Sequence, residues 1–290
     1  MNATETSDMF CDSHVHVVGD PVRYPLTGGR GYTPDPAPLA TLQGQAGPLG
    51  ITRFVIVQPS FYGNNNSLLL DTLDALEGQG RGVAAVDPAA GRDELGDLAA
   101  RGVRGLRLNL YSNAAGVTGA VLQRRFEAMA ALARECDFHV EIIAPIAMLA
   151  ESAEFLRRSP VPVVVDHYGL FADETPDGLH GRALLALLRH PQFWMKLSAP
   201  YRSGGDILAV RPDRRWLGAI GECCGDRCVW GSDWPHTPPH EAQGRPESRV
   251  PYRALDYRAV FEGFRDSLPT DLPVERILRD NPARLYGFTA

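Results

Sequence analysis

The feature that most constrains this chain is a regular alternation of short apolar runs with helix-length segments. Eight runs rich in Val, Ile, Leu and Phe predict buried parallel strands at Met9–His16, Arg53–Gln58, Gly82–Val86, Val103–Asn109, Phe138–Ile143, Val161–His167, Phe193–Ser198 and Cys228–Asp233. The 3.6-residue period predicts helices between them, among them Ser67–Gln79 with Ser67 as N-cap, Asp93–Arg101, Gly119–Glu135 and Leu179–Arg189. The pattern predicts an α/β fold, a distorted (β/α)8 TIM barrel. A doubly wound open sheet is disfavoured, because no glycine-rich phosphate loop follows the first strand.

Composition predicts a soluble cytoplasmic protein. The chain has 290 residues, of which 44% are hydrophobic and 22% charged, and its net charge is -6. Since α/β barrels reach this length as one unit, residues 1–290 are expected to form a single domain. No apolar run is long enough to span a membrane, and the polar segment 1–8 lacks the features of a signal peptide. The acidic net charge argues against a nucleic-acid partner. A homo-oligomer remains possible.

The cysteines and the single lysine argue against a structural zinc site and a Schiff-base site. Five cysteines, an odd number, fit a reducing compartment. The cluster Cys223, Cys224 and Cys228 lacks a fourth ligand for structural zinc and is expected to be buried as small apolar side chains. Lys196 is the only lysine in the chain and lies in the middle of an expected strand. A Schiff-base role is disfavoured, because nothing nearby in the sequence indicates an activated amine.

Polar residues end three of the expected strands. His14 and His16 share one face of the first strand, because side chains alternate along a strand. Such a pair binds one metal ion or one substrate oxygen, or is simply two histidines at a strand end. His167 ends the sixth strand and Asp233 ends the eighth. Since barrel enzymes work at the carboxyl ends of their strands, the four side chains are expected to form one site.

Arginines and one tyrosine are candidates for binding an anion. Arg107 and Asn109 share a face at the end of the fourth strand, where an inward arginine can clamp a carboxylate. Arg202 follows the seventh strand and is compatible either with this role or with exposure. Tyr32 lies in the long loop 18–50, where it either contacts substrate or packs the loop.

Several motifs carry a family resemblance. The chain resembles the amidohydrolase superfamily in its amidohydrolase-2 branch, and especially the 2-pyrone-4,6-dicarboxylate lactonases. The matching motifs, in chain order, are Asp12-Ser13-His14-Val15-His16, Tyr24-Pro25-Leu26 with Tyr32-Thr33-Pro34, Gly102-Val103-Arg104-Gly105-Leu106-Arg107-Leu108-Asn109, Val165-Asp166-His167-Tyr168-Gly169, Trp230-Gly231-Ser232-Asp233-Trp234-Pro235-His236 and Asn281-Pro282-Ala283-Arg284-Leu285-Tyr286.

The resemblance implies a hydrolase in which water attacks a lactone carbonyl. It implies that Asp233 is the general base and that His14, His16 and His167 polarise the carbonyl oxygen. These roles suit a carboxylate in a dry barrel mouth and preorganised imidazole donors. The positions that match residues at the substrate or beside it are Arg107, Arg202, Tyr32 and His236.

Departures from the family pattern bear on substrate and metal. Ile143 replaces an aromatic residue and Leu170 replaces an arginine of the pyrone lactonases. Loss of an arginine weakens a two-carboxylate clamp, which favours a related anionic lactone such as a muconolactone or a sugar-acid lactone from aromatic or sugar-acid catabolism. The fifth strand also lacks a histidine at its end. We expect no obligatory metal; if zinc binds, His14, His16 and Asp233 are its expected ligands, with His167 or Glu141 added.

Three other functions compete with lactone hydrolysis. The first is a zinc-dependent decarboxylase of the same branch, which the missing histidine on the fifth strand disfavours. The second is a barrel that only binds a ligand, which has no need of a base beside three imidazoles. The third is a lactone isomerase, which is expected to dispense with part of the His–Asp set.

Overall fold

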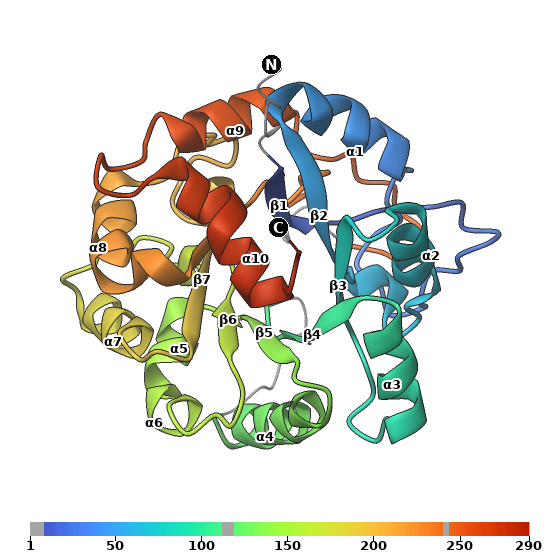
Figure 1. The fold of residues 1–290 in the computed structure, drawn as a ribbon, viewed down its shortest axis with the longest axis horizontal. Coiled ribbons are helices and arrows are strands. Elements are labelled where there is room, and N and C mark those ends of the chain that lie inside the picture. The colour runs from blue at the N-terminus through green and yellow to red at the C-terminus, as the bar shows by residue number, and fades with distance from the viewer. Residues whose placement is uncertain (1–8, 112–118, 240–243, 290) are drawn as a thin grey trace, which may run out of the picture.

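The computed structural model describes residues 9–111, 119–239 and 244–289, so segment 1–8 lies outside the described part. Eight parallel strands form one sheet in the order β1 to β8, and they surround a common centre (Figure 1). The strands are β1 Phe10–Val15, β2 Ile51–Val57, β3 Gly80–Ala84, β4 Val103–Asn109, β5 His139–Ile143, β6 Val163–Val165, β7 Phe193–Ser198 and β8 Cys228–Gly231. The predicted (β/α)8 barrel is confirmed.

Helices surround the strands, and the last of them crosses one end of the barrel (Figure 1). They are α1 Leu39–Ala46, α2 Ser67–Ala75, α3 Arg92–Ala100, α4 Gly119–Glu135, α5 Ile146–Glu151, α6 Ala153–Leu156, α7 Leu179–Leu188, α8 Arg214–Cys224, α9 Tyr257–Arg265 and α10 Asn281–Tyr286. In the predicted helix α4, Leu122, Phe126 and Met129 form a buried apolar face. In the described part of the chain, no helix is long and apolar enough to cross a membrane.

Several predicted element boundaries were wrong. The N-cap of α2 is Asn66 rather than Ser67, which is the first helical residue. The Ser67 amide and hydroxyl instead donate to Asn65 Oδ1. The loop predicted over residues 18–50 contains α1. Strand β3 begins at Gly80, two residues before its predicted start. Glycine leaves room there for the end of α2, because a Cβ at position 80 would lie 2.7 Å from Leu76 Cδ1.

Two strands end earlier than their sequences predicted. β6 stops at Val165 and β8 stops at Gly231, although the apolar runs were expected to continue to His167 and Asp233. In both cases the backbone turns into the left-handed region, with φ of 51° at His167 and 58° at Asp233. The two side chains therefore lie just beyond the strand ends.

The barrel interior is apolar at one end only. Val55, Val83, Val164 and Val229 are buried there, and Phe288, near the end of the chain, packs against them. Figure 1 shows α10 crossing this end of the barrel. Charged and polar side chains fill the remaining interior toward the carboxyl ends of the strands, where the candidate site lies.

Candidate active site

Asp12 links the ends of β1 and β8 and positions His14. Its Oδ1 accepts hydrogen bonds from the backbone amides of His14 (3.2 Å) and Ser232 (2.9 Å), and its Oδ2 accepts one from the Tyr257 hydroxyl (2.8 Å). Burial raises the pKa of Asp12 to about 6. Glycine is required at position 231, because a Cβ there would lie 2.5 Å from the Cβ of His14.

The four residues predicted to form one site lie together. The His14 ring centroid is 5.0 Å from that of His16 and 4.7 Å from that of His167. Asp233 Oδ1 is 3.4 Å from His16 Nε2 and 3.6 Å from His14 Nε2. The left-handed backbone at His167 and Asp233 costs conformational energy, and such strain is concentrated at functional sites.

Asp233 is an ionised carboxylate with one occupied oxygen and one open oxygen. Its Oδ2 accepts hydrogen bonds from Arg202 Nε and the Tyr201 hydroxyl, each at 2.8 Å. Within the described residues, no hydrogen bond reaches its Oδ1. Burial alone would raise the pKa of Asp233, but the Arg202 guanidinium and the neighbouring histidines hold it well below the ordinary value.

The hydrogen bonds of His16 and His167 determine what each ring presents to the site. His16 Nδ1 lies 2.8 Å from the carbonyl oxygen of Val57, which can only accept, so His16 donates through Nδ1. A neutral His16 therefore presents a lone pair at Nε2. His167 Nδ1 pairs with the Ser198 hydroxyl at 2.8 Å, and burial lowers the pKa of His167 to about 3. His167 is therefore neutral near pH 7.

A polar pocket opens above these residues. Besides Asp233 Oδ1, two of its lining groups have no hydrogen-bond partner among the described residues, the Tyr32 hydroxyl and Arg107 Nε. Arg107 is held in place by a hydrogen bond from Nη1 to the Gln58 carbonyl (2.6 Å). The pocket is lined by His16, Tyr32, Pro59, Ser60, Phe61, Arg107, Asn109, Ile143, His167, Arg202, Asp233 and Thr237. Two guanidinium groups and unpaired donors suit a small anion.

Three predicted site residues take positions that the sequence did not indicate. His14 is fully buried beneath the pocket and is not among its lining residues. His236 lies behind Tyr201, with Nδ1 3.2 Å from the hydroxyl oxygen, and burial lowers the pKa of His236 to about 4. Arg202 lines the pocket, but its guanidinium pairs with Asp233.

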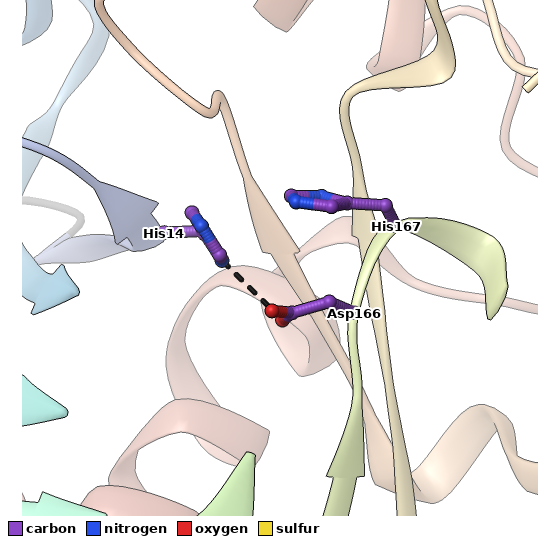
Figure 2. Close-up of side chains that lie close together, drawn as sticks. All are labelled: His14, Asp166 and His167. Carbon is purple, nitrogen blue, oxygen red and sulfur yellow. Dashed lines mark ion pairs between the residues drawn. The ribbon is translucent and has the colours of Figure 1, made fainter. Parts of the chain in front are cut away.

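A second group of charges lies directly below the pocket. We call His14, Glu141, Asp166 and Lys196 the ionic layer; all four side chains are buried. Lys196 on β7 donates to Glu141 on β5 and lies 3.7 Å from Asp166 Oδ1. Figure 2 shows His14 and His167 near Asp166; its dashed line marks the contact of His14 Nδ1 with Asp166 Oδ1 at 3.4 Å.

Sequence reasoning missed Lys196 and Tyr201. The signal for Lys196 was present, because a lysine inside an apolar strand is buried only when carboxylates pair with it. Tyr201 had no local signal beyond its place next to Arg202.

The described residues contain two groups with the spacing of a metal site. One group is His14, His16 and Asp233, as predicted; the other is His14, Asp166 and His167. In the first, His14 Nε2 and Asp233 Oδ1 are buried and lack hydrogen-bond partners among the described residues, so the group fits a metal ion or a bound water. Glu141, the added ligand considered from the sequence, belongs to neither group and pairs with Lys196.

Comparison with known proteins identifies a family that this sequence matches. The amidohydrolase family model matches residues 11–288, nearly the whole chain. The chain belongs to the amidohydrolase family. The matched range contains every predicted site residue.

Similar amidohydrolases have been described in several bacteria. The chain is 31% identical to a 4-sulfomuconolactone hydrolase of Rhizobium radiobacter, over 95% of this chain and 89% of that protein. It is 29% identical to a 2-pyrone-4,6-dicarboxylate hydrolase of Comamonas testosteroni, with the same coverage. A probable 2-pyrone-4,6-dicarboxylic acid hydrolase of Acinetobacter baumannii, solved with citric acid bound, shares 25% identity and a TM-score of 0.75, over 97% of this chain and 100% of the other.

Proposed function

We propose that this amidohydrolase opens a small anionic lactone by hydrolysis of the cyclic ester. The observation that carries the proposal is the Asp233 carboxylate, which is buried and held on one oxygen while its other oxygen faces His14 and His16. A binding protein has no need of an ionised carboxylate with an open oxygen next to imidazoles. The names of the similar proteins, which are hydrolases of two anionic lactones, support the same class of reaction.

In this proposal Asp233 Oδ1 removes a proton from the attacking water. His167, which lines the pocket, polarises the lactone carbonyl oxygen and stabilises the charge that develops on it. His14 lies beneath the pocket with Nε2 3.6 Å from Asp233 Oδ1, so we assign it to the water beside that oxygen. The bond from His16 to Val57 changes the role expected for His16, because a neutral ring with its proton on Nδ1 offers a lone pair at Nε2. We therefore assign His16 to orienting the water beside Asp233, and not to polarising the carbonyl.

Arginines and Tyr32 are proposed to bind the anionic groups of the substrate. Arg107 has a buried Nε without a partner among the described residues, and the Tyr32 hydroxyl is likewise unpaired. Arg202 offers part of its guanidinium while its Nε stays on Asp233. Ile143 lines the pocket where the family resemblance implies an aromatic residue, and this supports a muconolactone-type or sugar-acid lactone over the flat pyrone dicarboxylate. His236 supports the pocket through Tyr201.

The same residues could hold one divalent metal ion. His14, His16 and Asp233 would be its ligands, as the unpartnered His14 Nε2 and Asp233 Oδ1 allow. When bound, a zinc ion would lower the pKa of a coordinated water toward about 7. We propose that such a metal is not obligatory.

Proton release from a panel of lactones tests the proposal. The panel contains 4-sulfomuconolactone, muconolactone, aldonolactones and 2-pyrone-4,6-dicarboxylate, each with untreated and chelator-treated protein. We expect turnover of an anionic lactone that survives the chelator and is lost in Asp233→Asn. The control is Asp97→Asn, which changes an exposed carboxylate of α3. Failure to open any lactone would refute the proposal and turn attention to decarboxylation, whereas turnover restored only by zinc would refute the statement about metal.

A further inference from the structure

Lys196, the only lysine of the chain, lies inside the barrel in contact with a site histidine. Its Nζ donates to Glu141 and lies 3.2 Å from His14 Nδ1, within hydrogen-bond distance. An ammonium group has three donors and no acceptor, so each of its hydrogen bonds must end on a lone pair. The contact to His14 therefore requires an unprotonated Nδ1.

Two carboxylates compete with the lysine for the same nitrogen. Asp166 Oδ1 lies 3.4 Å from His14 Nδ1, and Glu141 Oε1 lies 3.8 Å from it. Either oxygen could accept a proton from Nδ1, but within the described residues neither makes a hydrogen bond. Figure 2 shows the Asp166 carboxylate beside the His14 ring. The hydrogen-bond geometry thus favours Lys196 as the partner of Nδ1.

The charge state of His14 agrees with this geometry. The His14 ring is fully buried next to the Lys196 ammonium, and both conditions disfavour a positive charge on the ring. A neutral imidazole carries one proton, and the nitrogen that bears it is determined by the hydrogen bond at the other nitrogen.

We infer that Lys196 is a positioning residue that places the proton of His14 on Nε2. This nitrogen faces Asp233 Oδ1 at 3.6 Å. In its neutral form His16 has the opposite arrangement, because its Nδ1 donates to Val57 and leaves a lone pair at Nε2. The two rings present one donor and one acceptor beside the same carboxylate oxygen. That combination suits a water molecule, which both donates and accepts hydrogen bonds.

The same proton position opposes metal binding. A metal at His14 needs the lone pair of Nε2, and the displaced proton would then move to Nδ1 and bond to a carboxylate such as Asp166. The Lys196 ammonium faces Nδ1 and opposes a proton there. Lys196 thereby favours water over a metal ion between His14, His16 and Asp233.

The wild-type protein tests the inference directly. In protein labelled with ¹⁵N-histidine, long-range ¹H–¹⁵N correlation spectra distinguish protonated from unprotonated ring nitrogens. The eight histidines are resolved by comparison with His14→Gln, which lacks the signals of this ring. We expect an unprotonated Nδ1 and a protonated Nε2 at His14. A proton on Nδ1 would overturn the inference, and this result does not depend on any variant being folded.

A pair of variants tests whether Lys196 is the cause. In Lys196→Met combined with Glu141→Gln, a positive and a negative charge are removed together, and the His14 proton is expected on Nδ1 next to Asp166. The matched control, Glu141→Gln alone, keeps the lysine and is expected to keep the proton on Nε2. Near-ultraviolet circular dichroism verifies that both are folded. A folded double variant with the wild-type proton position would contradict the role of Lys196.

Zinc titration by calorimetry supplies a readout that does not require activity. After chelator treatment, the double variant is expected to bind zinc at least about 10-fold more tightly than Glu141→Gln. Equal affinities would refute the claim that Lys196 opposes the metal. A drop in kcat with little change in KM is also expected in the double variant, and only this last readout rests on the proposed lactone hydrolysis. If no lactone is a substrate, the spectra and the titration still decide the inference.

Discussion

The pocket and the ionic layer beneath it contain similar residue types, but they use them in opposite ways. In the ionic layer, Lys196 lies within 4.0 Å of Glu141, Asp166 and His14, and all four side chains are sealed from solvent. In the pocket, Tyr32 and other lining groups leave donors and acceptors without partners among the described residues. Opposite charges sealed below the pocket hold the structure together, whereas groups that open onto the pocket can bind and react. The comparison predicts that changes in the pocket chiefly reduce activity, whereas changes below it, other than at His14 and Lys196, chiefly reduce stability.

The largest effect is expected when Asp233, the proposed general base in the pocket, is replaced. Asp233→Asn keeps the shape of the side chain but removes the proton acceptor, and kcat is expected to fall by about 10²- to 10⁴-fold. Initial rates of proton release on the best lactone of the panel measure this. Asp97→Asn should have wild-type kcat. Wild-type turnover by Asp233→Asn would show that Asp233 in the pocket is not the general base.

The next largest effect tests the ionic layer. Glu141→Gln leaves the Lys196 ammonium with one fewer carboxylate, and the free energy of unfolding is expected to fall by about 3 kcal/mol. Urea denaturation measures it, with the exposed Glu151→Gln as control. Because Glu141 does not line the pocket, KM should stay within about twofold of wild type. A variant that loses substrate affinity but no stability would reverse the comparison.

Substrate binding through Arg107 gives a smaller effect. Arg107→Met removes a buried donor from the pocket, and KM is expected to rise about 10- to 100-fold with kcat nearly unchanged. Steady-state kinetics on the anionic lactone measure both constants. The control is Arg124→Met, which changes an exposed arginine of α4. An equal loss of kcat and no change in KM would place Arg107 in the reaction step and not in binding.

The smallest effect concerns pH. The pKa of His236 is lowered by burial from 6.5 to about 4, so between these values the unfolded chain binds a proton that the folded protein does not. The resulting stability is complete above pH 6.5 and is lost as the pH falls toward 4. When the pH is lowered from about 8 to about 5.5, the free energy of unfolding of His236→Gln should therefore fall by about 1 kcal/mol less than that of wild type. Urea denaturation at both pH values measures the difference; identical losses would contradict the buried neutral ring.

The sequence predicted the parts of the molecule that depend on local periodicity. The eight strands were recognisable because each is a short apolar run, and the meeting of His14, His16, His167 and Asp233 followed from the common edge of a parallel barrel. Boundaries were less accurate where the backbone left the strand for the left-handed region, as at His167 and Asp233. Nothing in a single strand's residue pattern indicates such a turn.

What the sequence determined by itself is therefore the fold class and the gathering of His14, His16, His167 and Asp233 at one end of the barrel. Only the tertiary structure decided how those residues divide into two layers. Lys196 meets His14 across 182 positions of the chain, and Arg202 meets Asp233 across 31. These pairings depend on the stagger between strands and on how far each side chain reaches into the barrel. Both are set by packing of the whole barrel, because no local sequence pattern encodes the height of a side chain relative to another strand.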